Sequence, residues 1–397
     1  MQELSPRKIV WLSNIYDQNY EAERGEEIVP CLSSAKRRDL IKCVADATGL
    51  EVVILSSPPK AARRRGGKWL PALKTKFSSH TQFFCPNWDI PKLRIPLSWF
   101  FYVRHALKHT RRGDLVIIDN YEIIYVFAAY GLKWFRGVHF VLDYEDGKHL
   151  IDKSWSRVLS GLAELMGRRL VQAAFLTHPS LAARLPARVP TELVPGFVVG
   201  TNSGGNQPNS DSVRFLYSGS LDAARGIDVL LGALPLLPVA GWRLDITGAG
   251  PLEADVARAA QDRRWSDRLT YHGVLPSAVM AELVAQCDVG LNCQKTSDPI
   301  SEVTFPSKIF SYLSAGLLIV SSRASQVDKV CGNACLYYEA DDPRVLAAAI
   351  RQVVENFSGL RNGLDEKTVR EKYSLEGTAE RLKKILIPIT AQARAAC

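Results

Sequence analysis

Between Arg214 and Gly316 the sequence repeats one pattern, in which an apolar strand runs into a glycine-containing turn and then a helix. The turns follow a fixed order: Ser218-Gly219-Ser220-Leu221 with Arg225-Gly226, then Thr247-Gly248-Ala249-Gly250-Pro251, then His272-Gly273-Val274-Leu275, then Phe305-Pro306-Ser307-Lys308 ahead of Ser314-Ala315-Gly316. Because each turn joins a strand to a helix, backbone N–H groups and helix N-termini should converge on one edge of a parallel sheet. Such an edge is suited to binding the phosphates of a nucleotide.

The first half of the chain alternates strands and helices in the same way. Apolar strands are predicted at residues 8–13, 51–56, 114–119, 138–142 and 173–177, with helices at 33–48 and 122–135. The Gly-, Pro- and Ser-rich run at 203–212 is typical of a linker. A last helix is predicted over 374–387, with Leu375, Ala379, Leu382 and Ile385 on one stripe. The chain therefore divides into two doubly wound α/β domains (1–202 and 213–372), joined by the linker (203–212) and followed by a C-terminal segment (373–397).

Composition argues against a membrane-spanning or a secreted, disulfide-bonded protein. Of the 397 residues, 47% are hydrophobic and 23% are charged, and charges interrupt every long apolar run. The N-terminus lacks the pattern of a signal peptide. The eight cysteines form no regular framework, so reduced thiols and a cytoplasmic location are expected.

The positive charge lies in the first half. Residues 1–202 hold 29 Lys and Arg against 19 Asp and Glu, whereas residues 203–397 hold 21 against 22. Thirteen of the basic residues fall between Lys60 and Arg112, where Asp89 is the one acid, and aromatic side chains lie among them. A surface of this kind suits an anionic membrane or an acidic acceptor. The predicted contact residues are Arg63, Arg64, Arg65, Lys68, Trp69, Lys74 and Lys76. The alternatives are a nucleic acid, which no accompanying RNA-binding motif favours, and an aromatic core with solvated lysines.

The ordered turns of the second half resemble the donor domain of family 4 glycosyltransferases. The matching residues are Gly219-Ser220-Leu221, Arg225-Gly226, Gly248-Ala249-Gly250-Pro251 and Ser314-Ala315-Gly316. The resemblance implies the GT-B fold, in which two Rossmann-like domains face each other across a cleft and a C-terminal helix crosses back to the first domain. It implies that residues 1–202 bind the acceptor and residues 213–372 bind a nucleotide-sugar donor. It also implies retaining transfer without a metal ion or a bound cofactor.

The resemblance assigns the donor-binding residues one by one. Arg225 matches the family's diphosphate-binding lysine, and Lys308 with Ser307 opens a helix whose N-terminus favours an anion. Gly219, Gly248 and Gly250 allow a close backbone approach, and His272 and Val274 lie in the segment that reads the base. The predicted catalytic residues of this domain are Arg225 and Lys308.

Two positions depart from the family pattern. Ser220 stands where the family has a second cation, and Ser311 stands where a glutamate would bind the ribose. The other glutamate of the family's Glu-x7-Glu pattern would fall on Val303, so Glu302 is the candidate for contacting the donor sugar.

In the first domain, Asp143, Glu145 and Asp146 follow a buried strand and form the candidate acceptor-side carboxylates. One of them could orient the acceptor hydroxyl or take its proton. A solvated acidic turn, with Asp146 capping a helix, is the structural alternative.

These observations predict a glycosyltransferase that acts on a saccharide or lipid-linked acceptor of surface polysaccharide or glycolipid synthesis, at the cytoplasmic face of the membrane. The first alternative is a degenerate GT-B protein that serves as a non-catalytic binding or scaffold subunit, for which Ser220 and Ser311 argue. The second is a GT-B enzyme without a sugar acceptor, such as a nucleotide-sugar epimerase, which would have no use for the basic aromatic segment.

Overall fold

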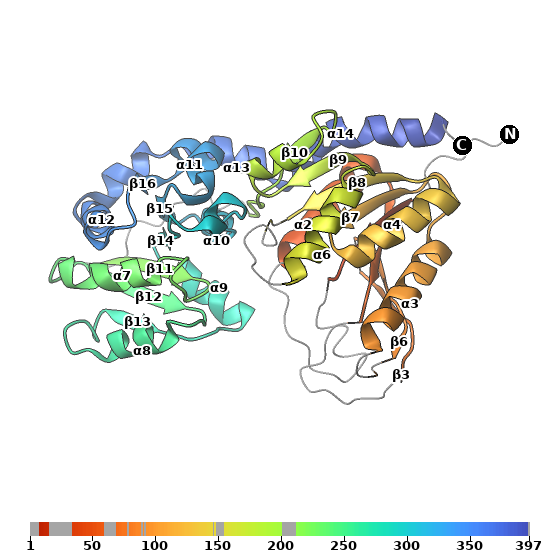
Figure 1. The fold of residues 1–397 in the computed structure, drawn as a ribbon. Coiled ribbons are helices and arrows are strands. Elements are labelled where there is room, and N and C mark those ends of the chain that lie inside the picture. The colour runs from red at the N-terminus through yellow and green to blue at the C-terminus, as the bar shows by residue number, and fades with distance from the viewer. Residues whose placement is uncertain are drawn as a thin grey trace. The chain divides into compact units, whose positions relative to one another are not determined.

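A computed structural model describes residues 8–15, 34–58, 69–77, 79–88, 90, 93–145, 147, 155–200 and 212–395. The chain forms two compact units, which are drawn in Figure 1. The first comprises residues 1–194 and 375–397, and the second comprises residues 195–374.

The first unit is built on an eight-stranded sheet with the order β10-β9-β8-β7-β1-β2-β5-β4. Every neighbouring pair is parallel except β4 and β5 at one edge. The strands are β1 (Lys8–Leu12), β2 (Glu51–Ser56), β4 (Leu73–Lys76), β5 (Thr81–Phe84), β7 (Leu115–Asp119), β8 (His139–Tyr144), β9 (Val171–Leu176) and β10 (Thr191–Leu193). A separate antiparallel pair joins β3 (Trp69–Leu70) to β6 (Asn87–Trp88).

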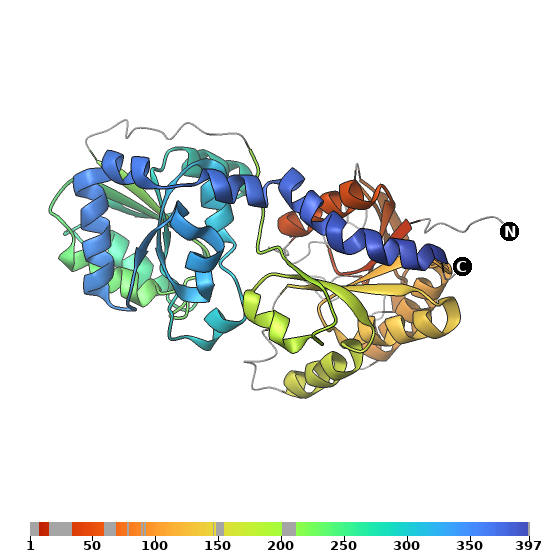
Figure 2. The ribbon, with the colours of Figure 1, turned by 90° about the horizontal axis from the view of Figure 1, so that it is seen from above.

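Helices cover this sheet because its central strands are apolar along their whole length and need burial on both faces. The helices are α2 (Ser34–Thr48), α3 (Arg94–His109), α4 (Ile123–Arg136), α6 (Trp155–Gly167), the 3₁₀ helix η1 (Pro179–Arg184) and α14 (Leu375–Ala395). The chain returns to the first unit in α14, which lies along α2 in Figure 2. The Cys43 thiol donates to the Leu375 carbonyl (3.3 Å), and Arg381 pairs with Glu192 (2.7 Å). The predicted return of the C-terminal helix is thus confirmed.

The second unit has a six-stranded sheet, parallel throughout, with the order β13-β12-β11-β14-β15-β16. Its strands are β11 (Val213–Ser218), β12 (Trp242–Thr247), β13 (Leu269–Tyr271), β14 (Val289–Asn292), β15 (Leu318–Ser322) and β16 (Leu336–Tyr338). Its helices are α7 (Ile227–Ala233), η2 (Leu234–Leu236), α8 (Glu253–Gln261), α9 (Ser277–Ala285), η3 (Pro299–Glu302), α10 (Lys308–Ala315), η4 (Ala324–Gln326), α11 (Val327–Cys331), η5 (Gly332–Ala334), α12 (Pro343–Gly363) and α13 (Lys367–Tyr373). In chain order the strands are arranged 3-2-1-4-5-6, which is the doubly wound Rossmann arrangement.

The structure differs from the sequence reading at several element ends. The helix α14 continues through Pro388 to Ala395, and its buried stripe is Ala379, Leu382, Leu386 and Ile389, since Ile385 is half-buried. Residues 195–200 pack with the second unit, where the Val198 N–H donates to the Tyr373 carbonyl (2.9 Å). The predicted linker lies outside the described residues except for Ser212, and the domain roles remain predictions.

None of the helices in the described part of the chain has the length and apolar composition that a bilayer crossing requires.

Candidate functional site

In the second unit's sheet, the order in which strands are added reverses between β11 and β14. The chain leaves β11 toward β12 on one side and leaves β14 toward β15 on the other, so β11 and β14 form a topological switch point. Parallel α/β sheets bind ligands at the carboxyl ends of such strands. The turn Ser218–Ser220 follows β11, and Cys293 and Gln294 follow β14. The predicted glycine turns therefore meet at the position where this topology forms a binding site.

Two of the glycine turns interlock at this edge. Gly219 and Gly248 have φ angles of 137° and 134°, which side chains rarely adopt. A Cβ at Gly248 would overlap the Gly219 carbonyl, and one at Gly250 would lie 2.6 Å from the Leu221 carbonyl oxygen. The Leu221 N–H donates to the Ala249 carbonyl (3.0 Å). Glycine is required here because the two backbones touch.

We expect Gly248→Ala to lower stability by about 2–4 kcal/mol, since it adds backbone strain to an overlap with the Gly219 turn. Urea unfolding measures the loss. The matched control is Gly363→Ala, at a position where an added Cβ meets nothing within 4 Å. Equal stability of the two variants would show that the turns do not interlock as described.

Arg225 is held beside the turn after β14. Its backbone N–H donates to Asp222 Oδ1 (2.8 Å), and its guanidinium donates to Gln294 Oε1. The buried Gln294 amide is fixed in turn, because it donates to Ser301 Oγ (2.9 Å) and Ser325 Oγ (2.7 Å). Arg225 therefore lies at the end of a rigid polar network.

The glycine that follows Arg225 allows this arrangement. Gly226 has φ 74° at the start of α7, and a Cβ there would overlap the Cys293 carbonyl. The arginine can approach the β14 turn because the next residue has no side chain.

Lys308 is the most unusual residue of this edge. Its ammonium nitrogen is buried, lies 3.8 Å from the ring centroid of Tyr217, and has no hydrogen-bond partner among the described residues. Burial lowers its pKa to about 7, and the nearby Arg225 contributes to the lowering. A Cβ placed on Gly219 would lie only 3.3 Å from this nitrogen, so the ammonium faces the turn after β11.

Lys308 is held there by the next turn of its helix. Tyr312 lies four residues on and packs its ring over Gly290 of β14. Its hydroxyl accepts from the Ser218 N–H (3.0 Å). Tyr312 fixes α10 against β11 and β14. The Lys308 ammonium is therefore held at this position beside the Gly219 turn.

The structure places the other predicted donor-side residues around this centre. Ser220 is exposed and donates to Asp222 Oδ2 (2.6 Å). Ser307 precedes α10, is exposed and forms no side-chain cap. Glu302 is exposed at the end of η3, whereas Val303, at the expected register, is buried.

His272 and Val274 lie near the end of β13 with different surroundings. The His272 ring contacts the buried Asp245 (Nε2 to Oδ1, 2.6 Å), which also binds Arg214 (2.6 Å). The imidazole therefore points toward the ion pair of Asp245 and Arg214. Val274 is 73% exposed and remains free to cover an apolar ligand face.

Ser311 is exposed on α10 and lines a groove of about 580 Å³ between α9 and α10. Leu275 and Ser277 line the same groove. Its polar lining consists of the hydroxyls of Ser277, Ser311 and Ser314 together with Asp288 and Arg361. The carboxylate that the family pattern places at position 311 is absent.

The first unit has its own switch point, between β1 and β7, and charged side chains fill it. Ser13 donates to Asp119 Oδ2 (2.9 Å), and Arg37 from α2 donates to Asp119 Oδ1 (2.9 Å) and Glu145 Oε2 (2.5 Å). Asp119 and Asp143 are paired residues of β7 and β8. Asp119 and Glu145 therefore share the buried Arg37 guanidinium, Lys36 Nζ lies 3.9 Å from Glu145 Oε1, and Asp143 lies beside Asp119.

Asp143 and Glu145, predicted as catalytic, differ in accessibility. Asp143 is buried, and its Oδ2 has no hydrogen-bond partner among the described residues. Burial raises the pKa of both Asp143 and Asp119, and neighbouring carboxylates raise each further. Glu145 is partly exposed and ion-paired with Arg37. Asp146 lies outside the described residues. Within the described ranges, no three His, Cys, Asp or Glu side chains are grouped to hold a metal ion.

The predicted basic aromatic surface is described only in part, since Arg63, Arg64, Arg65 and Lys68 lie outside the described residues. Trp69, Lys74 and Lys76 are exposed. Phe84 and Tyr102 of the same segment are buried in the core. The aromatic residues are thus divided between core and surface.

Sequence reasoning missed Gln294, Asp119 and Arg37. Asp119 ends a buried strand beside the predicted Asp143, and that position could have marked it. No local pattern marks Gln294 or Arg37, whose partners are 69 and 82 residues away along the chain.

Comparisons with known proteins agree with this geometry. Residues 212–356 match the family model described as glycosyl transferases group 1. No curated protein sequence matches the chain. Sucrose-phosphate synthase from Thermosynechococcus elongatus superposes with a TM-score of 0.66 at 16% identity, over 97% of this chain and 100% of that one.

Two further solved structures are similar. HepE from Anabaena in complex with UDP gives a TM-score of 0.66 at 12% identity, over 96% of this chain and 100% of that one. The lipopolysaccharide outer core galactosyltransferase WaaB gives 0.63 at 12% identity, over 96% and 99%.

The chain is a glycosyltransferase of GT-B fold. The region that matches the family model contains the interlocked glycine turns, Arg225 and Lys308 of this glycosyltransferase. The switch point of its first unit lies outside the matched region.

Proposed function

We propose that this glycosyltransferase transfers a sugar from a nucleotide-sugar donor, bound by the second unit, to a saccharide or lipid-linked acceptor bound by the first. The ammonium of Lys308, buried beside the Gly219 turn without a hydrogen-bond partner among the described residues, carries the donor assignment. Burying a charge without a partner is costly, so an anion that binds there would be favoured.

The diphosphate would occupy the space bordered by Gly219, Arg225 and Lys308. Negative charge grows on the diphosphate as the bond to the sugar breaks, and cations placed beforehand stabilise that transition state. Arg225 offers a planar guanidinium already oriented by Gln294. Lys308 supplies the second charge that Ser220 does not, so the donor site has two cations despite that departure from the family pattern.

The nucleoside would lie against the segment after β13 and the start of the groove between α9 and α10. Val274 is exposed there, and the Ser311 hydroxyl lines the groove. We assign no base contact to the His272 side chain, because Asp245 engages it. Binding measurements with different nucleotide sugars would identify the base.

We further propose that the transfer is retaining, as the family resemblance implies, and that it needs no metal ion or cofactor, because Arg225 and Lys308 supply the positive charge at the leaving group. Activity should therefore withstand an excess of chelator. Its abolition, with recovery on adding Mg²⁺, would contradict this part of the proposal.

On the acceptor side, Glu145 is the accessible carboxylate and is held by Arg37. We propose that it orients the acceptor hydroxyl or takes its proton, with the buried Asp143 behind it. The basic aromatic residues Trp69, Lys74 and Lys76 favour an acceptor anchored in a membrane, at its cytoplasmic face. The similar WaaB is a lipopolysaccharide outer core galactosyltransferase, and this likeness supports a role in surface polysaccharide or glycolipid synthesis.

A non-catalytic scaffold is the second candidate, since Ser220 and Ser311 replace charged residues of the family pattern. This role predicts that a nucleotide sugar binds without turnover, or does not bind. The fixed arrangement of Arg225 and Lys308 favours the enzyme.

The test is the release of nucleoside diphosphate from a panel of nucleotide sugars, with and without candidate acceptors. Arg225→Ala should lower turnover by at least about 100-fold, as expected when one charged donor to the transition-state charge is lost. The matched control is Arg258→Ala, an exposed arginine of α8. Turnover of Arg225→Ala close to that of wild type would remove the diphosphate assignment.

A further inference from the structure

We propose that helices α3 and α4 of the first unit form a surface that binds the headgroup region of an anionic phospholipid bilayer. The inference extends the membrane part of the proposed function to described residues that the sequence reading did not select, Trp69 excepted. Its observations lie wholly within the first unit, and its test does not depend on donor binding.

Large aromatic side chains are exposed along these helices. Trp134 is 86% exposed, Phe135 67% and Phe100 63%. Phe127, about two helical turns before Trp134 on α4, is exposed as well. So many exposed rings on neighbouring elements are unusual for a surface that stays in water.

Several of these rings contact one another in two groups. On one side, Trp69 lies edge-on to Trp88 (centroids 5.8 Å apart) and to Phe101 (5.5 Å), and Phe101 contacts Phe100 (5.5 Å). On the other side, Trp99 of α3 meets Phe127 of α4 (5.5 Å). Both groups reach the groove between α3 and α4, which Trp99, Phe100 and Phe127 line.

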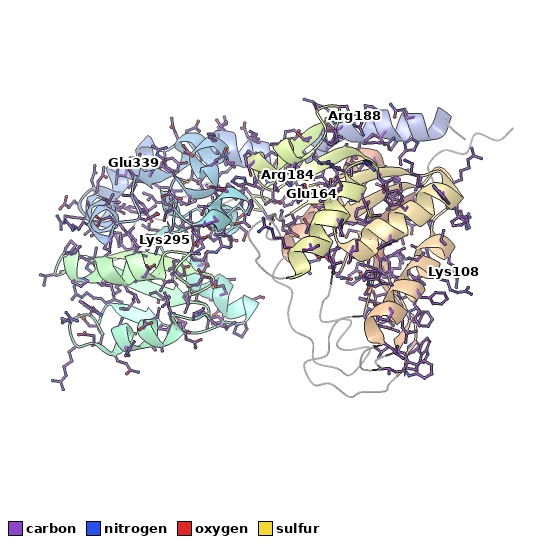
Figure 3. The ribbon with its side chains drawn as sticks, in the orientation of Figure 1. Lys108, Glu164, Arg184, Arg188, Lys295 and Glu339 are labelled. Carbon is purple, nitrogen blue, oxygen red and sulfur yellow. The ribbon has the colours of Figure 1, made fainter. Side chains whose placement is uncertain are left out.

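The charge around these rings is mainly positive. From Arg94 to Arg136 the sequence holds seven Lys and Arg and three acids. Two of those acids, Asp114 and Asp119, are buried at strand ends, which leaves Glu122 as the exposed acid. Arg104, Lys108, Arg111 and Arg112 are exposed, and Figure 3 shows Lys108 projecting outward from α3.

Between the helices lies an apolar groove of about 740 Å³. Val103 and Leu107 of α3 and Ile124 and Phe127 of α4 line it, and its cations are Arg104, Lys108 and Arg136. Arg136 is already engaged, donating to the Thr110 carbonyl (3.1 Å) and the Leu107 carbonyl (3.2 Å). Arg104 and Lys108 are therefore the cations placed to meet a phosphate above an apolar groove.

This combination selects a bilayer as the partner. Tryptophan and phenylalanine settle at the boundary of headgroups and acyl chains, and lysine and arginine are attracted to anionic headgroups. Stacking of nucleic-acid bases needs open ring faces, whereas the rings of the Trp69 group pack edge to face at 69–74°.

Co-sedimentation of the full chain with vesicles tests the inference. Wild type should bind phosphatidylcholine vesicles that contain phosphatidylglycerol and should bind pure phosphatidylcholine weakly, with affinity that falls as salt rises. Replacing Arg104, Lys108, Arg111 and Arg112 with Gln should weaken binding by on the order of 100-fold or more. Replacing Phe100, Trp134 and Phe135 with Ser should also release the protein.

The matched control removes four exposed cations of the second unit, Arg243, Arg258, Arg263 and Lys329, so that net charge changes equally. This control should bind vesicles far more tightly than the α3 charge variant. All variants should bind a nucleoside diphosphate as wild type does, which separates a failure here from a failure of the donor assignment.

Three results would overturn the inference. One is equal loss of binding in the control and the α3 charge variant. Another is full binding by both surface variants, with loss only when Arg63, Arg64, Arg65 and Lys68 are replaced by Ser. The third is salt-dependent binding of a single-stranded oligonucleotide in place of vesicles.

Discussion

Lys308→Met is expected to weaken donor binding by about 2–4 kcal/mol, or ~30- to 1,000-fold in Kd, because it removes one partner of a buried charge pair formed with the diphosphate. The same substitution should leave the unliganded protein as stable as wild type or more so, since it removes a buried ammonium that no described residue binds by a hydrogen bond. If Lys308 only stabilised the fold, Lys308→Met would destabilise the unliganded protein and leave donor affinity unchanged. Calorimetric titration and urea unfolding of the same preparations measure the two effects.

The pH dependence follows from the lowered pKa of Lys308. Its ammonium titrates at about 7 in the folded, unliganded protein, against 10.5 in an exposed lysine. Between these values the unfolded chain binds more protons, so the stability of the unliganded protein rises with pH across this window. Donor binding runs the other way, because the diphosphate needs the protonated form. Affinity should fall on the order of 10-fold from pH 7 to pH 8.5, with proton uptake on binding.

Lys329→Met, at an exposed position of α11, is the matched control and should bind donor like wild type with the same pH dependence. The assignment fails if Lys308→Met binds donor as tightly as this control, or if it retains the wild-type pH dependence.

Arg37→Met is expected to destabilise the first unit by about 3–5 kcal/mol, because it leaves buried carboxylates without their cation. Arg37 binds both Asp119 and Glu145, and Asp143 lies beside them. Thermal and urea unfolding measure the loss.

The pH dependence of the Arg37→Met variant has a predictable sign. Burial raises the pKa of Asp119 and Asp143 in the folded protein, and loss of the guanidinium raises both further. The folded variant then binds more protons than the unfolded chain, so its stability should recover as pH falls from neutral toward the ordinary pKa of a carboxyl. The control is Arg38→Met on the same helix, where the side chain is exposed. A variant that is least stable in acid would show that Arg37 does not neutralise these carboxylates.

The fold, and the sheet edge where we propose that the donor binds, could be predicted from the sequence because glycine turns are local signals. Gly219, Gly248 and Gly250 have the backbone angles or close approaches that exclude a side chain, so each position can be recognised within a few residues. Lys308 could be named for the same reason, since it opens a helix after Pro306.

Other features of the sites depend on contacts that no local pattern records. Gln294 orients Arg225 only because the ends of β11 and β14 are neighbours in the sheet. Arg37 reaches Asp119 and Glu145 from a helix near the start of the chain. The role of the His272 side chain depended on Asp245, 27 residues earlier. The ionic state of Lys308 depends on burial, which sequence reading does not give.

The α3–α4 surface shows the same limit. The sequence indicated basic and aromatic residues between Lys60 and Arg112, but it did not show which of them would be exposed. Tyr102 is buried while Phe100 is exposed, because a helix directs these neighbouring side chains to different faces. The contribution of Trp134 and Phe135, outside that segment, follows from the packing of α4 beside α3.

Calorimetric titration of the wild-type protein with UDP-, GDP- and ADP-sugars, without added metal, tests the central claim most directly. We predict saturable binding of sugars that share one base, weakened by both Arg225→Ala and Lys308→Met and unchanged by Arg258→Ala and Lys329→Met. Absence of binding to every donor by folded protein would contradict the donor site and favour the scaffold role. Binding that ignores Arg225 and Lys308 would place the diphosphate elsewhere.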